Sequence, residues 1–390
     1  MPPLVSNLDG VRRGNLSAVL GIVHRHGPVA RAWITTETGL NRSTVGVLVA
    51  ELASLGLVVE NSPEATNRVG RPSPSVSPNP DVVAVAVNPE VDAVTVGVVG
   101  LGARVEQQSR HDLGHPARPE EVAELVAGAV RRLAPRRIAG IGLAVPGLVR
   151  EADGVVRWAP HLGWTDAPIT ALVEQATGIR AFAANDASLG ALAERLFGAG
   201  RGVDELLYLN GGASGIGGGV IAGGRAIGGR GGYAGEFGQT RPGFSDPGDR
   251  RTANGTLEDE VSRERLLAAV GRASATEPEL AGALLDSTDP RVAAELARQR
   301  RVLAVALGNA VDLLNPEAVV LGGYLATLFT SAPLEFEREV AAQTVSAAWE
   351  GTRIVGAELG DRRLMVGAAE LAFAPLLADP AAARLELQRG

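Results

Sequence analysis

The sequence of 390 residues contains no cysteine and no lysine, so all 37 of its basic residues are arginine. The absence of cysteine excludes disulfide bonds, thiol nucleophiles and cysteine-ligated metal sites. No apolar run reaches the roughly 18 to 20 residues that a membrane-spanning helix needs. Residues 1–15 lack the apolar core of a secretory signal peptide. We therefore expect a cytoplasmic protein without membrane contact.

Aromatic residues are also few, at 4%, whereas 45% of the residues are hydrophobic and 21% are charged. These hydrophobic and charged proportions are ordinary for a soluble globular protein, and the length allows two or three domains with cores of their own. The net charge of −7 excludes a protein that binds nucleic acid over its whole surface. Any nucleic-acid contact must therefore belong to one segment of the chain.

Three short helices are predicted near the N-terminus. Residues 15–26 show apolar side chains at spacings of three and four, and a second helix covers roughly residues 30–38. After a tight turn, Asn41 is a plausible cap for a third helix that extends to about residue 54. In a helix-turn-helix, the first residues of the last helix meet base edges in the major groove. The residues in that position are Arg42, Ser43 and Thr44.

A strand at residues 57–60 and a polar loop follow this third helix. The loop carries Arg68 and Arg71, which suit a β-wing that enters a minor groove. Up to residue 72 there are seven arginines and five acidic residues, so this segment is positive within a negative chain. We expect a winged helix-turn-helix over residues 1–78 that binds double-stranded DNA. The alternative is a small helical domain that makes dimer contacts, and the Pro- and Ser-rich residues 73–80 are interpreted as a linker.

The remainder of the chain has an α/β pattern. Three strands at 82–87, 93–99 and 103–107 are followed by a helix at 119–133 and a strand at 138–144. Strands in hairpins followed by alternating strands and helices indicate a mixed sheet. The pattern returns later, with a helix at 292–314 and a strand at 318–321, which favours two lobes around a cleft.

A glycine run is the centre of the predicted ligand site. Glycine fills more than half of positions 211–219, and β-rich segments flank the run. Such a run permits tight turns and a close approach of the backbone to a ligand. Asn185 and Asp186 directly follow a buried strand, where α/β folds place ligands, and Glu236 lies shortly after the run. We expect these residues to form a small-molecule pocket.

Taken together, these segments resemble the ROK family of repressors, open reading frames and sugar kinases, in its branch of transcriptional regulators. The resemblance implies an α/β fold in which an N-terminal winged helix-turn-helix precedes a two-lobed actin/hexokinase-like ROK domain of the sugar-kinase type. The ROK domain would cover residues 79–390, with lobes at roughly 79–195, joined by a C-terminal helix, and 196–368. The motifs that carry the resemblance are Val145-Pro146-Gly147, residues 159–164 (APHLGW), Asn185-Asp186-Ala187, the glycine run, residues 234–238 (AGEFG) and Leu257-Glu258.

The resemblance also implies a set of sugar ligands. In the family, sugar hydroxyls are held by an Asn-Asp pair, by the Glu and His of a GExGH motif and by a later Glu. Carboxylates and amides suit this task because they accept and donate hydrogen bonds to hydroxyls. In kinase relatives the Asp is also the general base. Asp186 would be the vestigial base position, and the alternative of a helix N-cap is compatible with ligand contact. The matching positions here are Asn185, Asp186, Glu236, Gln239 and Glu258.

Two departures from the family argue against catalysis and metal binding. The first phosphate loop of the kinases is replaced by residues 88–92 (NPEVD), which have no glycine, one fewer backbone donor at Pro89 and two acidic residues. Gln239 stands in place of the histidine that helps to bind zinc, and residues 241–256 have neither cysteine nor histidine. We therefore expect no cofactor, no metal and no enzymatic activity. The loop could be ordered by packing, by the ligand, or not at all.

The sequence thus predicts a DNA-binding transcriptional repressor that is controlled by a sugar or sugar derivative. Its partners would be an operator in double-stranded DNA, a sugar effector, and copies of itself in a homodimer or homotetramer, since helix-turn-helix proteins usually read two half-sites. Two alternatives stay open: an active ATP-dependent sugar kinase with a fused DNA-binding domain, and a regulator whose pocket binds nothing.

Overall fold

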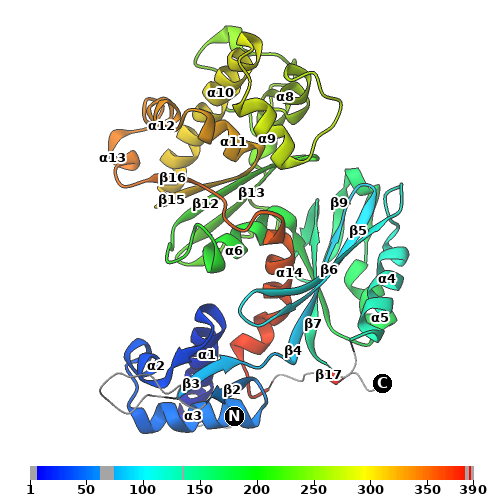
Figure 1. Ribbon diagram of the computed structural model, residues 1–390, viewed down its shortest axis with the longest axis vertical. Coiled ribbons are helices and arrows are strands. Elements are labelled where there is room, and N and C mark those ends of the chain that lie inside the picture. The colour runs from blue at the N-terminus through cyan, green and yellow to red at the C-terminus, as the bar shows by residue number, and fades with distance from the viewer. Residues whose placement is uncertain (1–6, 62–73, 134–135, 383–385, 388–390) are drawn as a thin grey trace.

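The N-terminal end consists of three helices and a small antiparallel sheet with strand order β1-β3-β2, drawn in blue in Figure 1. The structure is a computed structural model that describes residues 7–61, 74–133, 136–382 and 386–387; at 7, 8, 386 and 387 it describes the backbone alone. The N-terminal elements are α1 (Asn7–His26), β1 (Val29–Ala30), α2 (Arg31–Thr38), α3 (Arg42–Ser54), β2 (Val58–Asn61) and β3 (Ser75–Pro78).

The turn between α2 and α3 follows from two residues. Gly39 adopts a φ of 67°, a left-handed conformation that suits glycine, and it ends α2. The side chain of Asn41 accepts a hydrogen bond from the backbone N–H of Thr44 at 2.8 Å and so caps the start of α3, as predicted.

The interpretation of residues 73–80 as a linker is wrong for its described part. Ser75–Pro78 forms β3, the central strand of the small sheet, which pairs with both β1 and β2. The reason lies in the alternation of serine and valine. Val76 is fully buried, while Ser75 and Ser77 on either side of it are only half-buried. The composition of the stretch hid this two-residue period.

The first lobe is built on a sheet with strand order β11-β7-β4-β5-β6, in which β4, β5 and β6 are antiparallel and β7 and β11 run parallel to β4. Alternate residues of β4 face two cores: Val83 and Val85 face the layer of α4 and α5, whereas Ala84 and Ala86 face α14 (Figure 1). The elements of this lobe are β4 (Val82–Pro89), β5 (Ala93–Gly100), β6 (Arg104–Asp112), α4 (Pro119–Arg131), β7 (Arg137–Val145), α5 (Ile169–Thr177), β11 (Ala181–Asn185) and α14 (Arg363–Ala378). A separate small sheet and further short elements complete it: β8 (Leu148–Arg150), β9 (Val155–Ala159), η1 (Pro160–Leu162), β10 (Trp164–Ala167), η4 (Gly360–Arg362) and β17 (Glu386–Leu387), which pairs with β7.

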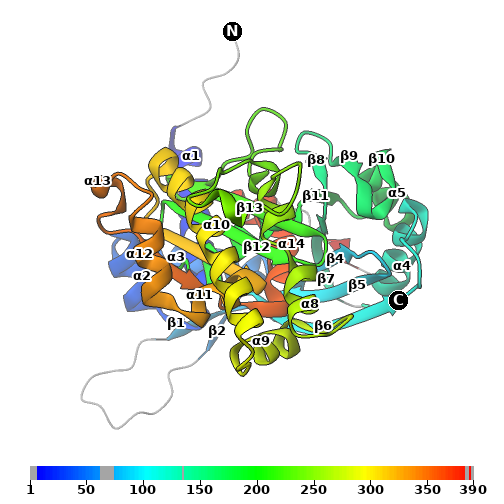
Figure 2. The same ribbon diagram turned by 90° about the horizontal axis from the view of Figure 1, so that it is seen from above.

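The second lobe has a sheet with strand order β14-β13-β12-β15-β16. α6 packs on one face of it, and the long helix α10 runs across the lobe among the helices on the other face (Figure 2). The elements are α6 (Asp186–Phe197), β12 (Leu206–Gly212), β13 (Gly215–Ala222), β14 (Arg225–Ala226), η2 (Phe237–Gln239), η3 (Pro247–Asp249), α7 (Leu257–Glu260), α8 (Arg263–Ala269), α9 (Glu277–Leu285), α10 (Pro290–Leu314), β15 (Ala318–Gly323), α11 (Tyr324–Ser331), α12 (Pro333–Ala341), α13 (Ser346–Trp349) and β16 (Arg353–Gly356).

The predicted α/β class and the two sheets are confirmed. The domain boundaries stay a prediction, and the lobe boundary proposed at residue 195 falls inside α6, which packs on α14 as well as on β12 and β13.

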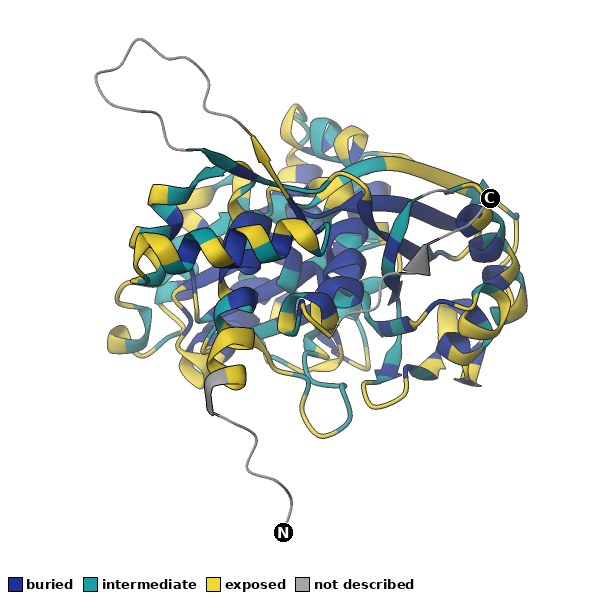
Figure 3. Ribbon diagram, turned by 90° about the horizontal axis from the view of Figure 1, so that it is seen from below, coloured by how far each residue is buried: buried dark blue, intermediate teal, exposed yellow. Residues whose placement is uncertain are grey.

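The N-terminal helices do not stand apart from the first lobe. α1 and α14 lie side by side, and apolar residues of both helices belong to one buried core that also includes residues of β4 and β5. The hydroxyl of Ser17 donates to the carbonyl oxygen of Leu377 at 2.7 Å, and Arg13 pairs with Asp379 at 3.1 Å. Figure 3 shows this side of the molecule, where the buried faces of helices and strands point inward and the exposed faces point to solvent.

Candidate functional site

Four of the five predicted ligand residues come together between the lobes. The side-chain Nε2 of Gln239 donates a hydrogen bond to Oε1 of Glu258 at 2.5 Å. The surrounding protein partly desolvates the Glu236 carboxyl group and so raises its pKa, although solvent still reaches the residue, and the nearby negative charges of Glu258 and Asp186 raise this pKa further. The Glu236 side chain is exposed and carries no hydrogen bond to another described side chain, so its carboxylate is open to a ligand.

The start of α6 positions Asn185 and Asp186. Asn185, and not Asp186, is the N-cap, because its Oδ1 accepts from the backbone N–H of Ser188 at 3.0 Å. Its Nδ2 donates to the carbonyl oxygen of Gly147 at 3.2 Å, so both ends of this amide already have a partner. Asp186 is the first residue of the helix, which corrects the alternative assignment of Asp186 as the cap.

The carboxyl group of Asp186 holds its proton unusually well. Burial raises its pKa to about 6, although a hydrogen bond from the backbone N–H of Ala187 and the positive charge of Arg363 act in the opposite direction. Arg363 is the first residue of α14, so a positive charge at the start of that helix acts on this carboxyl group. No local pattern in the sequence indicates that a residue 177 positions further on would act on Asp186.

The glycine run brings the β12–β13 hairpin close to this group. Gly215 has a φ of 121°, and a side chain there would collide with the carboxylate of Glu258. The backbone N–H of Ile216 instead donates to Oε2 of Glu258 at 3.2 Å. Gly217 faces α6, where an added Cβ would lie 2.6 Å from the Cβ of Ala187. The run is therefore a close-packed turn that seats one of the predicted ligand residues.

The loop at residues 241–256 is held by buried ion pairs. Asp249, 4% exposed, accepts two hydrogen bonds from Arg301 of α10, at 2.6 and 2.8 Å. Glu260, fully buried, accepts from the backbone N–H groups of Arg251 and Thr252 and lies 3.4 Å from Arg298 of α10. Of the alternatives left open for this loop, the structure corresponds to ordering by packing.

Sequence reasoning missed Arg298 and Arg301. The helix containing them showed only its amphipathic pattern, and their partners Glu260 and Asp249 lie 38 and 52 positions earlier in the chain. One signal was present: a cluster of arginines interrupts the apolar face of a helix that must otherwise be buried.

The two acidic side chains of the β4–β5 turn have partners on neighbouring strands. Glu90 accepts a hydrogen bond from the hydroxyl of Thr95 at 2.5 Å and lies 3.3 Å from Arg110 of β6. Arg110 also donates to Asp92 at 2.7 Å. Both acidic side chains of this turn are thus tied to the neighbouring strands, and Pro89 pairs with Val94 within the ladder.

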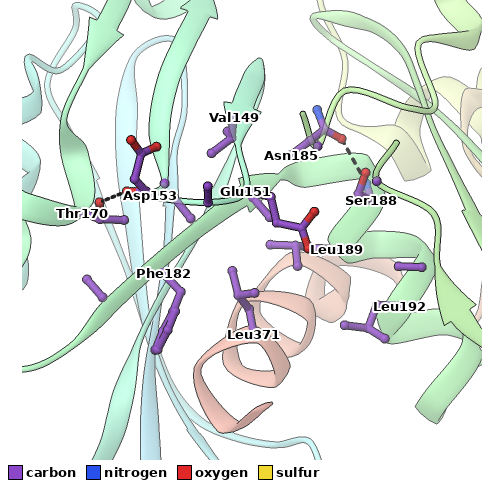
Figure 4. A pocket seen from close by; sticks show the side chains of 18 of the residues that line it. Val149, Glu151, Asp153, Thr170, Phe182, Asn185, Ser188, Leu189, Leu192 and Leu371 are labelled. Atoms are coloured by element: carbon purple, nitrogen blue, oxygen red, sulfur yellow. Dashed lines mark hydrogen bonds between the residues drawn. The ribbon is translucent and has the colours of Figure 1, made fainter. Parts of the chain in front are cut away.

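A separate cavity of about 460 Å³ lies beside the edge strand β11 (Figure 4). Glu151, Phe182, Leu189 and Leu371 line it, together with Asn185 from the predicted ligand set. Asp186, Glu236, Gln239 and Glu258 do not line it. Of the predicted ligand residues, Asn185 alone lines this cavity, so the carboxylate cluster lies outside it.

The predicted DNA contacts lie at the first turn of α3. Arg42 and Ser43 are exposed, Thr44 is half-buried, and the Ser43 hydroxyl donates to Oδ1 of Asn41 at 2.7 Å. One turn further on, Val47 is 66% exposed, an unusual place for a valine on a helix that packs its other apolar residues inward. The wing residues Arg68 and Arg71 lie outside the described residues.

The described part of the chain has neither a metal-binding cluster nor a membrane-spanning helix. Among the side chains that the structure describes, no three histidine, aspartate or glutamate residues gather closely enough to hold a metal ion. No helix in the described part of the chain combines the length and apolarity required to cross a membrane.

Comparison with known proteins places the chain among regulators and kinases that share this architecture. The sequence model described as ROK family matches residues 86–374. The xylose repressor of Caldicellulosiruptor bescii is 28% identical over 375 residues, which cover 90% of this chain and 93% of that protein. The glucokinase of Streptomyces coelicolor is 28% identical over 289 residues, 68% of this chain and 90% of the kinase. A crystal structure of a ROK family transcriptional regulator, a homologue of the E. coli MLC protein, has a TM-score of 0.75 and 22% identity, covering 94% of this chain and 97% of that one.

Proposed function

We propose that this chain, which belongs to the ROK family, is a DNA-binding transcriptional repressor whose kinase-like part binds a sugar or sugar derivative that controls DNA binding. One observation carries the proposal: a helix-turn-helix with an exposed first turn of α3 shares a core with the first lobe, and a cluster of carboxylates lies where that lobe meets the second. Similarity to the xylose repressor extends over 90% of the chain, including part of the N-terminal segment, and supports the same function.

For DNA, we propose that α3 enters the major groove and that Arg68 and Arg71 contribute further contacts. Arg42 and Ser43 are positioned to reach base edges or phosphates, and the exposed Val47 suits apolar contact with a thymine methyl group. Capture of genomic DNA by the purified protein, followed by footprinting, tests this. A protected inverted repeat is expected, and its absence at low salt, where phosphate contacts are strongest, contradicts it.

A pair of variants locates the DNA contact. Arg42→Ala is expected to weaken binding to the captured fragment by about 1–3 kcal/mol. Arg291→Ala, an exposed arginine at the start of α10, is the matched control and should leave binding unchanged. Equal effects of the two changes would mean that α3 is not the recognition helix.

For the effector, we propose that sugar hydroxyls bind Asp186, Glu236, Gln239 and Glu258, with Asn185 contributing its remaining N–H and lone pair. The raised pKa values of Asp186 and Glu236 show carboxyl groups that would gain from hydrogen-bond donors such as hydroxyls. Because sugars differ in the direction of their hydroxyls, such a polar group discriminates among them.

The effector site is tested with D-xylose and D-glucose by calorimetric titration. Glu236→Gln removes a charged acceptor and is expected to weaken binding about tenfold or more, since a hydrogen bond to a charged group contributes about 1.5–3 kcal/mol. Glu151→Gln changes the neighbouring cavity beside β11 and should have no effect. The reverse result would move the effector into that cavity.

We further propose that the chain is not a kinase. The observation is the β4–β5 turn, where Glu90 and Asp92 would repel phosphate and Pro89 lacks an N–H. The protein with ATP, magnesium and either sugar is expected to form no sugar-dependent ADP. Clear turnover would favour the alternative of a sugar kinase with a fused DNA-binding domain.

The division into a DNA-binding segment at residues 1–78 and a ROK domain at 79–390, and assembly as a homodimer or homotetramer, belong to the same proposal. An inverted repeat in the footprint supports at least a dimer, because a two-fold operator matches a two-fold protein.

A further inference from the structure

α1 carries a buried histidine that has no part in the proposed DNA or sugar contacts. His24 is 1% exposed, and its Nε2 lies 3.0 Å from each carboxylate oxygen of Glu370 on α14, which is 4% exposed. The backbone N–H of Gly102, in the β5–β6 turn, donates to Nδ1 at 3.0 Å. Because Nδ1 accepts, the ring hydrogen lies on Nε2 and points to Glu370. One imidazole therefore connects α1 to two elements of the first lobe.

The carboxylate of Glu194 lies near His24 and holds both connections between the lobes. The chain passes from the first lobe to the second along α6, which packs on elements of both lobes, and it returns between β16 and α14. Glu194 of α6 is fully buried and accepts hydrogen bonds from the backbone N–H groups of Ala199, Glu358 and Leu359 at 2.9, 3.1 and 2.9 Å. Any rotation of one lobe against the other must bend the chain at these connections, so this is the hinge.

His24 packs directly against that hinge. Its ring meets the ring of Phe197, the last residue of α6, edge-on at 5.3 Å and 87°. Phe373 of α14 lies on another side at 5.9 Å. His24 thus contacts the end of α6 that lies one turn beyond Glu194, and the middle of α14.

The same two helices reach the proposed sugar site at their other ends. α6 begins at Asp186, and α14 begins at Arg363, whose charge acts on Asp186. Between the two ends the helices are in close contact: Gly367 lies against the backbone of Leu189, with no space for a side chain. The pair is one packed unit with the sugar site at one end and His24 at the other.

We propose that His24 couples the sugar site to the DNA-binding segment. Closure of the lobes around a sugar turns the hinge at Glu194 and moves Phe197 and α14. Because His24 is bonded to Glu370 and Gly102 and packed on Phe197, α1 and the recognition helix attached to it follow this movement. A ligand alters an equilibrium between two states only if it binds them unequally. Here the two states are the open and the closed arrangement of the lobes, and the contacts of His24 give the DNA-binding segment a different position in the two. This inference rests on the proposed function.

The test measures coupling and not affinity alone. The dissociation constant for the captured genomic fragment is determined with and without saturating D-xylose or D-glucose, and sugar affinity is measured separately. His24→Asn keeps an acceptor near Gly102 but removes the donor to Glu370. Ser17→Ala is the matched control, since it removes a hydrogen bond between the same two helices away from the hinge. Phe197→Leu is a second variant that keeps an apolar side chain but withdraws the ring from His24.

Coupling between two sites of an allosteric protein typically amounts to about 5–150-fold in affinity. We expect His24→Asn and Phe197→Leu to bring the sugar-dependent change in DNA affinity below about twofold, while sugar affinity and sugar-free DNA affinity stay within about threefold of the parent protein. Ser17→Ala should keep the full change. If both hinge variants keep the parent's change, or if Ser17→Ala loses as much, the inference is overturned and the proposed function stands. If the parent protein binds no DNA, or neither sugar alters its DNA binding, the proposed function fails and the inference falls with it.

Discussion

Replacing Glu194 by glutamine should destabilise the protein through one definable set of hydrogen bonds. The carboxylate accepts three backbone N–H groups, two at Oε2 and one, from Leu359, at Oε1. With the amide oxygen placed at Oε2, two bonds change from charged to neutral acceptors, at a cost of about 1 kcal/mol each. The amide nitrogen then faces the N–H of Leu359, which is buried and left without an acceptor, at about 1–3 kcal/mol.

The amide is easier to bury than a carboxylate, which offsets part of this sum, so we expect a net loss of about 2–4 kcal/mol. The assay is urea denaturation followed by circular dichroism, in parallel with Glu205→Gln. Glu205 accepts a single backbone N–H, from Gly223, at a partly exposed position, and its variant should cost less than about 1 kcal/mol. If Glu194→Gln loses no more than this control, Glu194 does not hold the two connections between the lobes.

Three further predictions concern the site and its supports. The pKa of Asp186 rises from 3.8 to about 6 on folding, so the folded protein binds a proton between these pH values, and Asp186 makes the protein less stable as the pH rises through this range. In thermal unfolding, Asp186→Asn should therefore be more stable than the parent above pH 6, and the difference should vanish below about pH 4. A difference in stability that stays constant with pH would contradict the raised pKa. Gly217→Ala places a methyl group 2.6 Å from the Cβ of Ala187 on α6 and should lower the free energy of unfolding by about 1–3 kcal/mol. Gly212→Ala, whose methyl group would have its nearest neighbour at 3.7 Å, should change stability little. Equal melting temperatures of the two variants would argue against close packing at Gly217. Arg298→Met leaves the buried carboxylate of Glu260 without a cation and should lower the free energy of unfolding by about 3–5 kcal/mol. Arg291→Met, at an exposed position, should lower it by less than about 0.5 kcal/mol. A small loss at position 298 would mean that solvent reaches the Arg298–Glu260 pair.

Local signals in the sequence predicted the fold well. The cap at Asn41, the tight turn at Gly39 and the alternating strands around β4 are encoded by neighbouring residues, and the structure has them. The linker at residues 73–80 failed because composition was weighed above the period of two that buries Val76. A central strand with prolines at its border is hard to distinguish from a linker without its partners.

Local signals in the sequence predicted the candidate site only in part. Family-like motifs placed Asp186, Glu236 and Glu258, but their supports come from distant segments. The charge of Arg363 acts on Asp186 from the start of α14, and Arg298 meets Glu260 from another helix. Long-range pairs of this kind leave no periodic trace in the sequence, since each partner looks like an ordinary surface charge until the packing of the helices is known.

The central claim is that a sugar controls DNA binding, and one titration tests it most directly. The purified protein is titrated onto its captured genomic fragment at fixed salt, in the absence and presence of saturating D-xylose or D-glucose. The account predicts a change in DNA affinity of about fivefold or more with at least one sugar that also binds in the absence of DNA. Tight DNA binding that stays the same while a sugar demonstrably occupies the protein would contradict it.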